Sequence, residues 1–311
     1  MRHRSRGVCA TTLGILLLGP YAVIAQTPEV DTRPALPFPP GMTIQNQCGE
    51  VNEQEDVELY KGTLGVSLDH VRTHEPSTLQ LQWLSATEIG ARLPNHRPGN
   101  IAEIRWCSGT LISPDLVLTA AHCFQVQRKS MYDWESPFTT DAGGSRRSAA
   151  PAVLATLQQA NFRYQRDGTT SAIRTAVVFP VTSLVEYGPD RAGALDYAIV
   201  RLGPDGSGTL PGALFAPATT LTRNLVDMER VAILQHPHGQ PKKIDAGTVL
   251  DVVGPDVYYN DIDTNSGASG AGVRDASGAV VAVHTFGGCT RTSGANRGVP
   301  NSAIAAVSNI L

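Results

Sequence analysis

Short runs of apolar residues, separated by turn-forming residues, make up most of the chain after about residue 57. Leu79, Leu81 and Trp83 alternate with glutamines, which is the pattern of a strand with one buried face. Further apolar runs predict strands at Ile101–Trp106, Thr110–Ile112, Leu116–Thr119, Ala176–Phe179, Ala198–Leu202, Arg230–Leu234, Thr248–Val253 and Ala279–His284. Clusters of Gly, Pro, Asn and Asp separate these runs at spacings typical of β-sandwiches and β-barrels.

Helical periodicity is scarce along the chain. Only Pro151–Gln159 and Ser302–Leu311 have a helical pattern, and the alternation of strands and helices that builds parallel sheets is absent. The polar, turn-rich stretch from Ser130 to Thr170 predicts surface loops. The pattern therefore predicts an all-β fold with a helix at the C-terminus.

The N-terminus has the pattern of an export signal. Three arginines precede an apolar run from Leu13 to Ile24, and the small residues before Gln26 suit cleavage after Ala25. The run is short for a membrane span, although an uncleaved anchor is the alternative. We expect a signal peptide at residues 1–25, a proline-rich arm or pro-segment at 26–57, one domain at 58–311, and a secreted or periplasmic location.

The composition is that of an ordinary globular protein, with 41% hydrophobic and 17% charged residues among 311. Loss of the signal would remove three arginines and leave 22 basic against 28 acidic residues, so the formal charge would move from −3 to −6. No basic stripe is visible, which argues against a nucleic-acid partner. We expect a monomer that binds protein or peptide substrates and has no membrane contact after signal cleavage.

Four cysteines remain after signal cleavage: Cys48, Cys107, Cys123 and Cys289. An even number in an exported chain predicts two disulfides, for which three pairings are available. A zinc site is not expected, because none of the four has a C-x-x-C neighbour or a suitably spaced histidine. No metal or cofactor is predicted.

A candidate general base lies at His122, directly after the predicted strand Leu116–Thr119. The neighbouring Cys123 can pair with Cys107, sixteen residues earlier, and such a bridge would fix the loop that carries the imidazole. A general base needs this, because proton transfer works only over hydrogen-bond distance. Taken alone, a histidine beside a cysteine is more often a core or surface residue.

Asp196 begins a strongly apolar strand, where an unpaired carboxylate would be costly to bury. A partner removes that cost. If Asp196 accepts the Nδ1 proton of His122, it selects the tautomer whose Nε2 can receive a proton from a serine. Without such a partner, Asp196 would be an exposed residue at the start of a strand.

A candidate nucleophile, Ser269, lies between Gly267 and Gly270 in a stretch rich in small residues. A serine becomes a nucleophile when a base takes its proton and donors hold the oxyanion, and glycine lets the backbone come close to the substrate. A simple turn explains this stretch equally well on its own. Ser266 is the alternative nucleophile, but the residue two before it is Thr264 rather than glycine.

Together these segments resemble a known family. C-S-G-T-L-I-S followed by L-T-A-A-H-C closely resembles the histidine segment of the trypsin-like (chymotrypsin-fold) serine peptidases. D-Y-A-I-V-R-L is similar to the aspartate segment, and the order His, Asp, Ser also matches. Residues 233–243, 263–270 and 280–288 resemble the bacterial branch that includes the glutamyl endopeptidases. The resemblance runs from about Leu79 to the C-terminus.

The resemblance implies two antiparallel six-stranded β-barrels, with a triad of His122, Asp196 and Ser269 in the cleft between them. It implies a serine endopeptidase that works through an acyl-enzyme, with the N–H groups of Gly267 and Ser269 as the oxyanion hole. A catalytically silent binding protein on the same fold is the alternative. With Cys107 and Cys123 paired, we predict that Cys48 bonds to Cys289.

The pocket residues give opposite indications. His284 resembles the histidine by which glutamyl endopeptidases meet an acidic side chain, whereas Asp263 stands where trypsins place the carboxylate that receives Arg or Lys. The two could neutralise each other, or Asp263 could turn away into a hydrogen-bonded loop. We expect a slight preference for an acidic residue at P1, the substrate position before the cleaved bond.

Two departures from the trypsin pattern also matter. Ala268 replaces the aspartate that pairs with a newly cut N-terminus in trypsins, so no such activation switch is expected. Gly272 replaces a frequent proline.

Overall fold

The structure is a computed structural model that describes residues 47–125, 134–188 and 195–311. The predicted signal peptide and the proline-rich part of the arm lie outside these ranges, as do the first residues of the Ser130–Thr170 insertion. Within the described ranges, no helix is both long enough and apolar enough to cross a membrane.

The first half of the described fold is a closed barrel of six antiparallel strands in the order β2-β3-β4-β9-β8-β7. Its strands are β2 (Thr78–Trp83), β3 (Arg105–Leu111), β4 (Leu116–Thr119), β7 (Gln158–Phe162), β8 (Val177–Gly188) and β9 (Tyr197–Leu202). Leu79, Leu81 and Phe162 pack in its interior. This half confirms one of the two predicted barrels.

Strand β2 is buried on both faces, not on one as its alternation predicted. The glutamine face is closed by side-chain amides, since Asn161 Nδ2 donates to Gln80 Oε1 and Gln82 Oε1 at 2.8 and 2.7 Å. Buried polar groups are tolerated when they are hydrogen-bonded. Polar residues at alternate positions therefore did not mark a solvent-facing surface.

The second half is an eight-stranded sheet that is not closed, in the order β1-β11-β10-β14-β15-β16-β13-β12. The expected second six-stranded barrel is therefore not confirmed. The strands are β1 (Glu55–Asp56), β10 (Arg230–Gln235), β11 (Lys243–Thr248), β12 (Asp251–Val253), β13 (Asp256–Tyr259), β14 (Gly272–Arg274), β15 (Val280–Phe286) and β16 (Asn296–Pro300). The short edge strand β1 comes from the N-terminal arm and pairs with β11.

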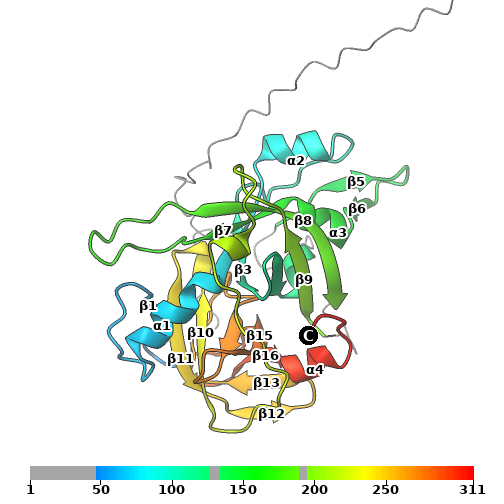
Figure 1. Cartoon of the computed structure of the whole chain (residues 1–311). Helices are drawn as coiled ribbons and strands as arrows, with labels where there is room; N and C mark the ends of the chain where they lie inside the picture. The colour runs from blue at the N-terminus through cyan, green and yellow to red at the C-terminus, as the bar shows by residue number, and fades with distance from the viewer. Residues whose placement is uncertain (1–46, 126–133, 189–194) are drawn as a thin grey trace, which may run out of the picture.

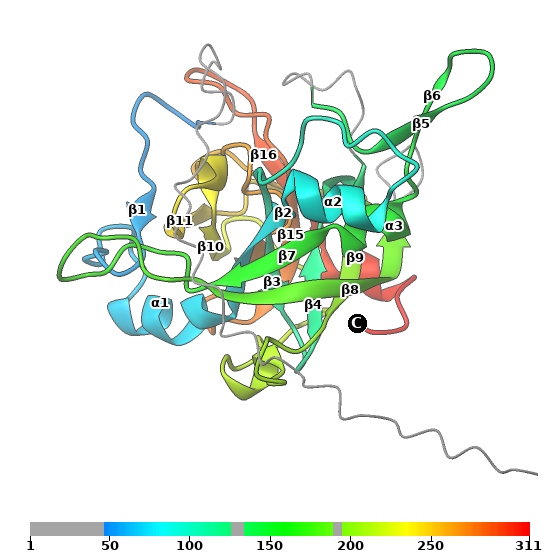
Figure 2. The ribbon, with the colours of Figure 1, turned by 90° about the horizontal axis from the view of Figure 1, so that it is seen from above.

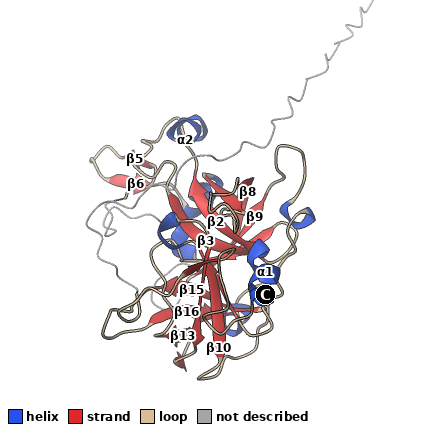
Figure 3. Cartoon of the chain, turned by 90° about the vertical axis from the view of Figure 1, so that its left-hand side faces the viewer, coloured by secondary structure: helices blue, strands red, loops and turns tan. Residues whose placement is uncertain are grey.

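The two halves lie one above the other, as Figures 1 and 3 show from two sides. Leu118 and Ile199 of the barrel pack against Val280, Val283 and Val299 of the sheet. This shared apolar cluster fixes the strand ends of one half against those of the other.

Helices are few and short: α1 (Leu68–His74), α2 (Ala86–Arg92), α3 (Pro151–Thr156) and α4 (Asn301–Ala305), with 3-10 turns η1 (Glu75–Ser77), η2 (Ala121–Phe124), η3 (Pro211–Ala213) and η4 (Pro237–Gly239). The predicted C-terminal helix over 302–311 ends at Ala305. The predicted helix at 151–159 ends at Thr156, because Gln158 already pairs in the barrel. A small hairpin of β5 (Phe138–Thr140) and β6 (Arg146–Ser148) projects from the insertion (Figure 2).

Two disulfides tie these parts together. Cys107 in β3 bonds to Cys123 in η2, and Cys48 in the arm bonds to Cys289 after β15. The pairing is the one predicted from the sequence. Because Cys48 is bonded and β1 is paired, the arm from about residue 48 to 57 belongs to the folded sheet.

Replacing both Cys48 and Cys289 by alanine should lower the free energy of unfolding by about 5 kcal/mol, because the bridge closes a loop of 241 residues in the unfolded chain. The Cys107–Cys123 bridge closes only 16 residues, so its double alanine variant should lose about 3 kcal/mol. Urea unfolding of the two double variants measures both losses. If removal of the Cys107–Cys123 bridge costs more free energy of unfolding than removal of the Cys48–Cys289 bridge, loop length does not determine which disulfide stabilises the protein more.

Candidate active site

His122 and Asp196 lie at the same end of two paired strands. Strands β4 and β9 are antiparallel, with Thr119 opposite Ala198. The chain leaves β4 into η2, which carries His122, and Asp196 directly precedes β9. His122 Nδ1 lies 2.6 Å from Asp196 Oδ2, and His122 N–H donates to Asp196 Oδ1 at 3.0 Å. The two predicted residues therefore meet through both carboxylate oxygens.

The environment of Asp196 favours the carboxylate. Burial by itself would raise the pKa of Asp196, but the imidazole of His122 and the N–H groups of His122 and Ala121 outweigh it, and its pKa falls below the usual range. The His122 side chain is 27% exposed and that of Asp196 is 9% exposed. The aspartate is thus an anion that holds Nδ1–H, while the imidazole remains partly exposed to solvent.

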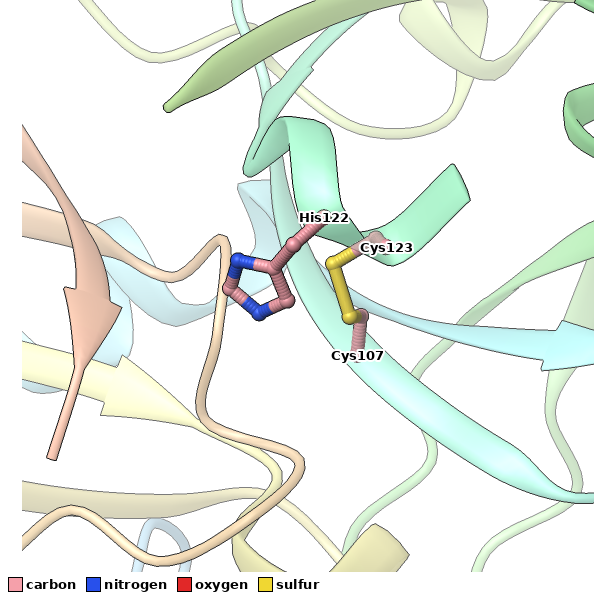
Figure 4. A group of neighbouring side chains, drawn as sticks. All are labelled: Cys107, His122 and Cys123. Atoms are coloured by element: carbon pink, nitrogen blue, oxygen red, sulfur yellow. A yellow bond between two sulfur atoms is a disulfide. The ribbon is translucent and has the colours of Figure 1, made fainter. Parts of the chain in front are cut away.

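The imidazole of His122 lies beside the Cys107–Cys123 disulfide and projects away from η2 (Figure 4). Possible ligand atoms of these three residues lie within 4.8 Å of one another. Both sulfurs are joined in the disulfide, however, and a metal requires thiolates. The bridge therefore holds the turn that carries His122, and its two sulfurs are not available as metal ligands.

Ser269 lies in the loop between β13 and β14, and hydrogen bonds hold this loop against both halves. Ser108 N–H of β3 donates to the Ser269 carbonyl at 2.8 Å, and Gly270 N–H donates to the His284 carbonyl at 2.7 Å. Cys123 Sγ lies 3.9 Å from the same Ser269 carbonyl. Ser269 is half-buried, and its backbone thus lies against Cys123, the residue that follows His122.

At two positions near Ser269, neighbouring atoms lie so close to the backbone that only glycine fits. A Cβ on Gly270, whose φ is +87°, would lie 2.0 Å from Thr119 Oγ1. A Cβ on Gly272 would lie 2.7 Å from Thr110 Oγ1, to which Gly272 N–H donates at 3.1 Å. Proline has no N–H to donate. This bond is lost if proline, which the resemblance leads one to expect, stands at position 272, and the short distance to Thr110 Oγ1 favours glycine there.

The backbone of the loop leaves two N–H groups unused. Ala268 N–H donates to the Asn265 carbonyl and Ala271 N–H to the Ala268 carbonyl, at 2.9 and 3.0 Å. Among the described residues, the N–H groups of Gly267 and Ser269 donate to no protein acceptor. Gly267 has a φ of +100°, a conformation that glycine adopts without strain.

Asp263 does not face an open pocket. Its carboxylate accepts the N–H groups of Cys48 and Glu53, at 2.6 and 2.9 Å, and its side chain is buried. Gln54 Nε2 donates to its carbonyl at 3.0 Å. Asp263 therefore holds the N-terminal arm, which corresponds to the alternative of a carboxylate turned into a hydrogen-bonded loop.

His284, on β15, is buried and neutral. Its Nδ1 is hydrogen-bonded to the Tyr259 hydroxyl, and its ring also interacts with the backbone of Arg297. Burial, followed by the electrostatic effect of nearby His122, lowers the pKa of His284 to about 3. His284 and Asp263 thus have separate partners and do not neutralise each other.

Sequence reasoning missed two residues of this site. Tyr259 holds His284 although 25 positions separate them, and nothing in a single sequence couples the two. Ser108 had no predicted role of its own within the histidine segment, yet it contacts the Ser269 loop through both its backbone and its hydroxyl. Its place between Cys107 and Gly109 in β3 was the available signal.

Two solved structures resemble this chain, and the first of them supports the fold. The chain resembles a structure titled "Structure of Glu endopeptidase in complex with MPD", with 17% identity, a TM-score of 0.50, and coverage of 84% of this chain and 96% of that one. A crystal structure of Deg5 matches with 15% identity, a TM-score of 0.46, and coverage of 77% and 90%. At such identities a likeness concerns the fold alone. No curated protein matches the sequence.

A family model described as "Trypsin-like peptidase domain" matches residues 107–283, which is more than half of the chain. The matched range begins at Cys107 and includes His122, Asp196 and Ser269. The paired His122 and Asp196 and the glycine-bounded Ser269 loop agree with that match. The chain therefore belongs to the trypsin-like peptidase family and has a chymotrypsin-like fold.

Proposed function

We propose that this protein is an exported serine endopeptidase that hydrolyses peptide bonds through an acyl-enzyme on Ser269. The observation that carries the proposal is the hydrogen-bonded pair of His122 and Asp196, which lies beside the Ser269 loop. The competing function is a binding protein without activity. A binding protein has no need for an imidazole oriented by a buried carboxylate.

In this mechanism Ser269 Oγ attacks the carbonyl carbon of the substrate while His122 Nε2 takes the hydroxyl proton. Asp196 keeps the proton on Nδ1 and stabilises the imidazolium that forms. The carbonyl oxygen becomes an oxyanion, which accepts hydrogen bonds from the N–H groups of Gly267 and Ser269. His122 then gives its proton to the leaving amine, and the C–N bond breaks to leave an ester on Ser269.

Hydrolysis of the ester repeats these steps with water. His122 takes a proton from the water, whose oxygen attacks the ester carbonyl, and then returns the proton to Ser269 Oγ as the acid product leaves. No metal or cofactor enters either half of the reaction. The oxyanion donors are backbone groups held in place before the substrate arrives, which is the arrangement that gives large rate effects.

The export part of the proposal rests on sequence and redox chemistry. Residues 1–25 have the pattern of a signal peptide, and two disulfides persist best in an oxidising compartment. We place the protein in the periplasm or the medium, with residues 48–57 retained on the domain through Cys48 and β1.

We further propose that an acidic residue is preferred at P1. The carboxylate that would attract Arg or Lys, Asp263, is engaged by the arm. Thr264 Oγ1 and Asn265 Nδ2 are buried and have no partner among the described residues, and we propose that these two donors face the incoming carboxylate. A nearby negative charge would also raise the pKa of His284 and favour its protonated form.

Reaction with a fluorophosphonate probe should label the wild-type protein on Ser269. Ser269→Ala should abolish labelling, and Asp196→Asn should lower the turnover of a peptide substrate by about 10⁴-fold, because the imidazole loses its orienting anion. Ser266→Ala is the matched control for the alternative nucleophile and should still be labelled. Correctly folded protein that resists the probe would favour the binding function.

Peptides that differ only at P1 should rank Glu and Asp first, above Gln and Leu, with Arg and Lys last. We expect Glu to exceed Gln by about tenfold to a hundredfold in kcat/KM, the range for a charged hydrogen bond of 1.5–3 kcal/mol. Thr264→Val should reduce this ratio, whereas Thr264→Ser, which keeps the hydroxyl, should not. Cleavage confined to Arg or Lys would exclude the acidic preference without affecting the proposed mechanism.

A further inference from the structure

Ser108 connects three parts of the site through one buried residue. It is fully buried in β3, and its hydroxyl donates to the Gly267 carbonyl at 2.8 Å. The same hydroxyl accepts His236 N–H at 2.9 Å, while Ser108 N–H donates to the Ser269 carbonyl at 2.8 Å. Every one of these bonds reaches the nucleophile loop or the turn that packs against it.

The carbonyl groups from Ser266 to Ser269 are all held by hydrogen bonds. Four consecutive carbonyls each accept a hydrogen bond: Ser266 from His238 N–H, Gly267 from the Ser108 hydroxyl, Ala268 from Ala271 N–H, and Ser269 from Ser108 N–H. In a trans peptide the C=O and N–H point to opposite sides. Holding the carbonyls of Ser266 and Ala268 therefore turns the N–H groups of Gly267 and Ser269 to the opposite side.

Gly267 is the weak point of this arrangement. It has no Cβ and a φ of +100°, so its flanking peptides can rotate with little steric resistance. Rotation of the Ser266–Gly267 peptide would remove one oxyanion donor. A side chain at this position could not add stiffness, because a Cβ on Gly267 would lie 2.6 Å from the His236 carbonyl. The carbonyl anchors must supply the rigidity instead.

We propose that Ser108 is a positioning residue: its hydroxyl holds the Gly267–Ala268 peptide, which lies between the two peptides that carry the oxyanion N–H groups, and so keeps both groups in their working orientation. The inference rests on the proposed function, since it assigns a role to the oxyanion hole of that mechanism. The other three carbonyl anchors are backbone N–H groups, which survive substitution. The Ser108 hydroxyl is the anchor that a single substitution removes, and its loss also leaves His236 N–H without its acceptor.

Ser108→Ala should lower kcat by about tenfold to a hundredfold, somewhat less than the loss of a complete oxyanion donor, and should change KM by less than about twofold. The variant should bind a peptide boronate, which places an oxygen in the oxyanion hole, more weakly by the same factor as its loss in kcat/KM. Its affinity for the product peptide should not change. Ser108→Thr, which keeps the hydroxyl, should restore kcat.

Thr110→Val is the matched control. Thr110 lies two residues further along β3, and its buried hydroxyl accepts Gly272 N–H at 3.1 Å, outside the oxyanion loop. This variant should lose thermal stability comparable to that of Ser108→Ala but keep its kcat. Equal losses of kcat in the two variants, or a wild-type kcat in Ser108→Ala, would overturn the positioning role.

If Ser108→Ala does not fold, Ser108→Cys replaces it, because a thiol fills the same space and donates more weakly. An intermediate kcat, with the Cys107–Cys123 bridge verified by non-reducing peptide mapping, supports the positioning role, and a wild-type kcat contradicts it.

Labelling of the wild-type protein by the fluorophosphonate distinguishes a failure of the positioning role from a failure of the proposed function. Labelled wild type with an unaffected Ser108→Ala variant refutes the positioning role alone, whereas unlabelled wild type refutes the proposed function.

Discussion

The hydrogen bond between His122 and Asp196 sets the main constraint on this molecule. A carboxylate at the entry of an apolar strand is stable only when its oxygens are satisfied, and here the imidazole and N–H of His122 satisfy them. That requires β4 and β9 to be neighbours in register. It also requires η2 to be held, which the bond between Cys107 and Cys123 does. The closed barrel thus serves to bring two strand ends together.

The same demand for satisfied polar groups explains the position of Asp263. In this chain its carboxylate accepts two N–H groups of the arm, and Cys48 fastens that arm to Cys289. A carboxylate used in this way has little capacity left for a substrate. The charge at one sequence position can therefore serve substrate binding in one protein and chain attachment in another, depending on which backbone donors reach it.

The sequence predicted the local features of this protein well and the distant ones poorly. His122, Asp196 and Cys123 stand in short contiguous segments, so the contact between His122 and Asp196 and the bond from Cys123 to Cys107 could be predicted from local patterns. The helix α2 also had a local signal, a capping box of Ser85 and Glu88 that was not used. The pairing of β1 with β11 and the partners of Asp263 depend on contacts across about two hundred positions. Such contacts leave no periodic trace in a single chain.

Alternation of polar and apolar residues misled most where polar side chains were buried in pairs. Gln80 and Gln82 bond to Asn161, and Ser108 bonds to Gly267, all within the interior. In both cases the polar group joins segments that are distant in sequence. Its hydrogen bond fixes the relative orientation of the two groups, which apolar packing does not do. Direction matters most where a backbone must be held at one angle, as around Gly267. A buried hydroxyl in a strand beside a glycine-rich loop is therefore better understood through the carbonyl it orients than through the area it buries.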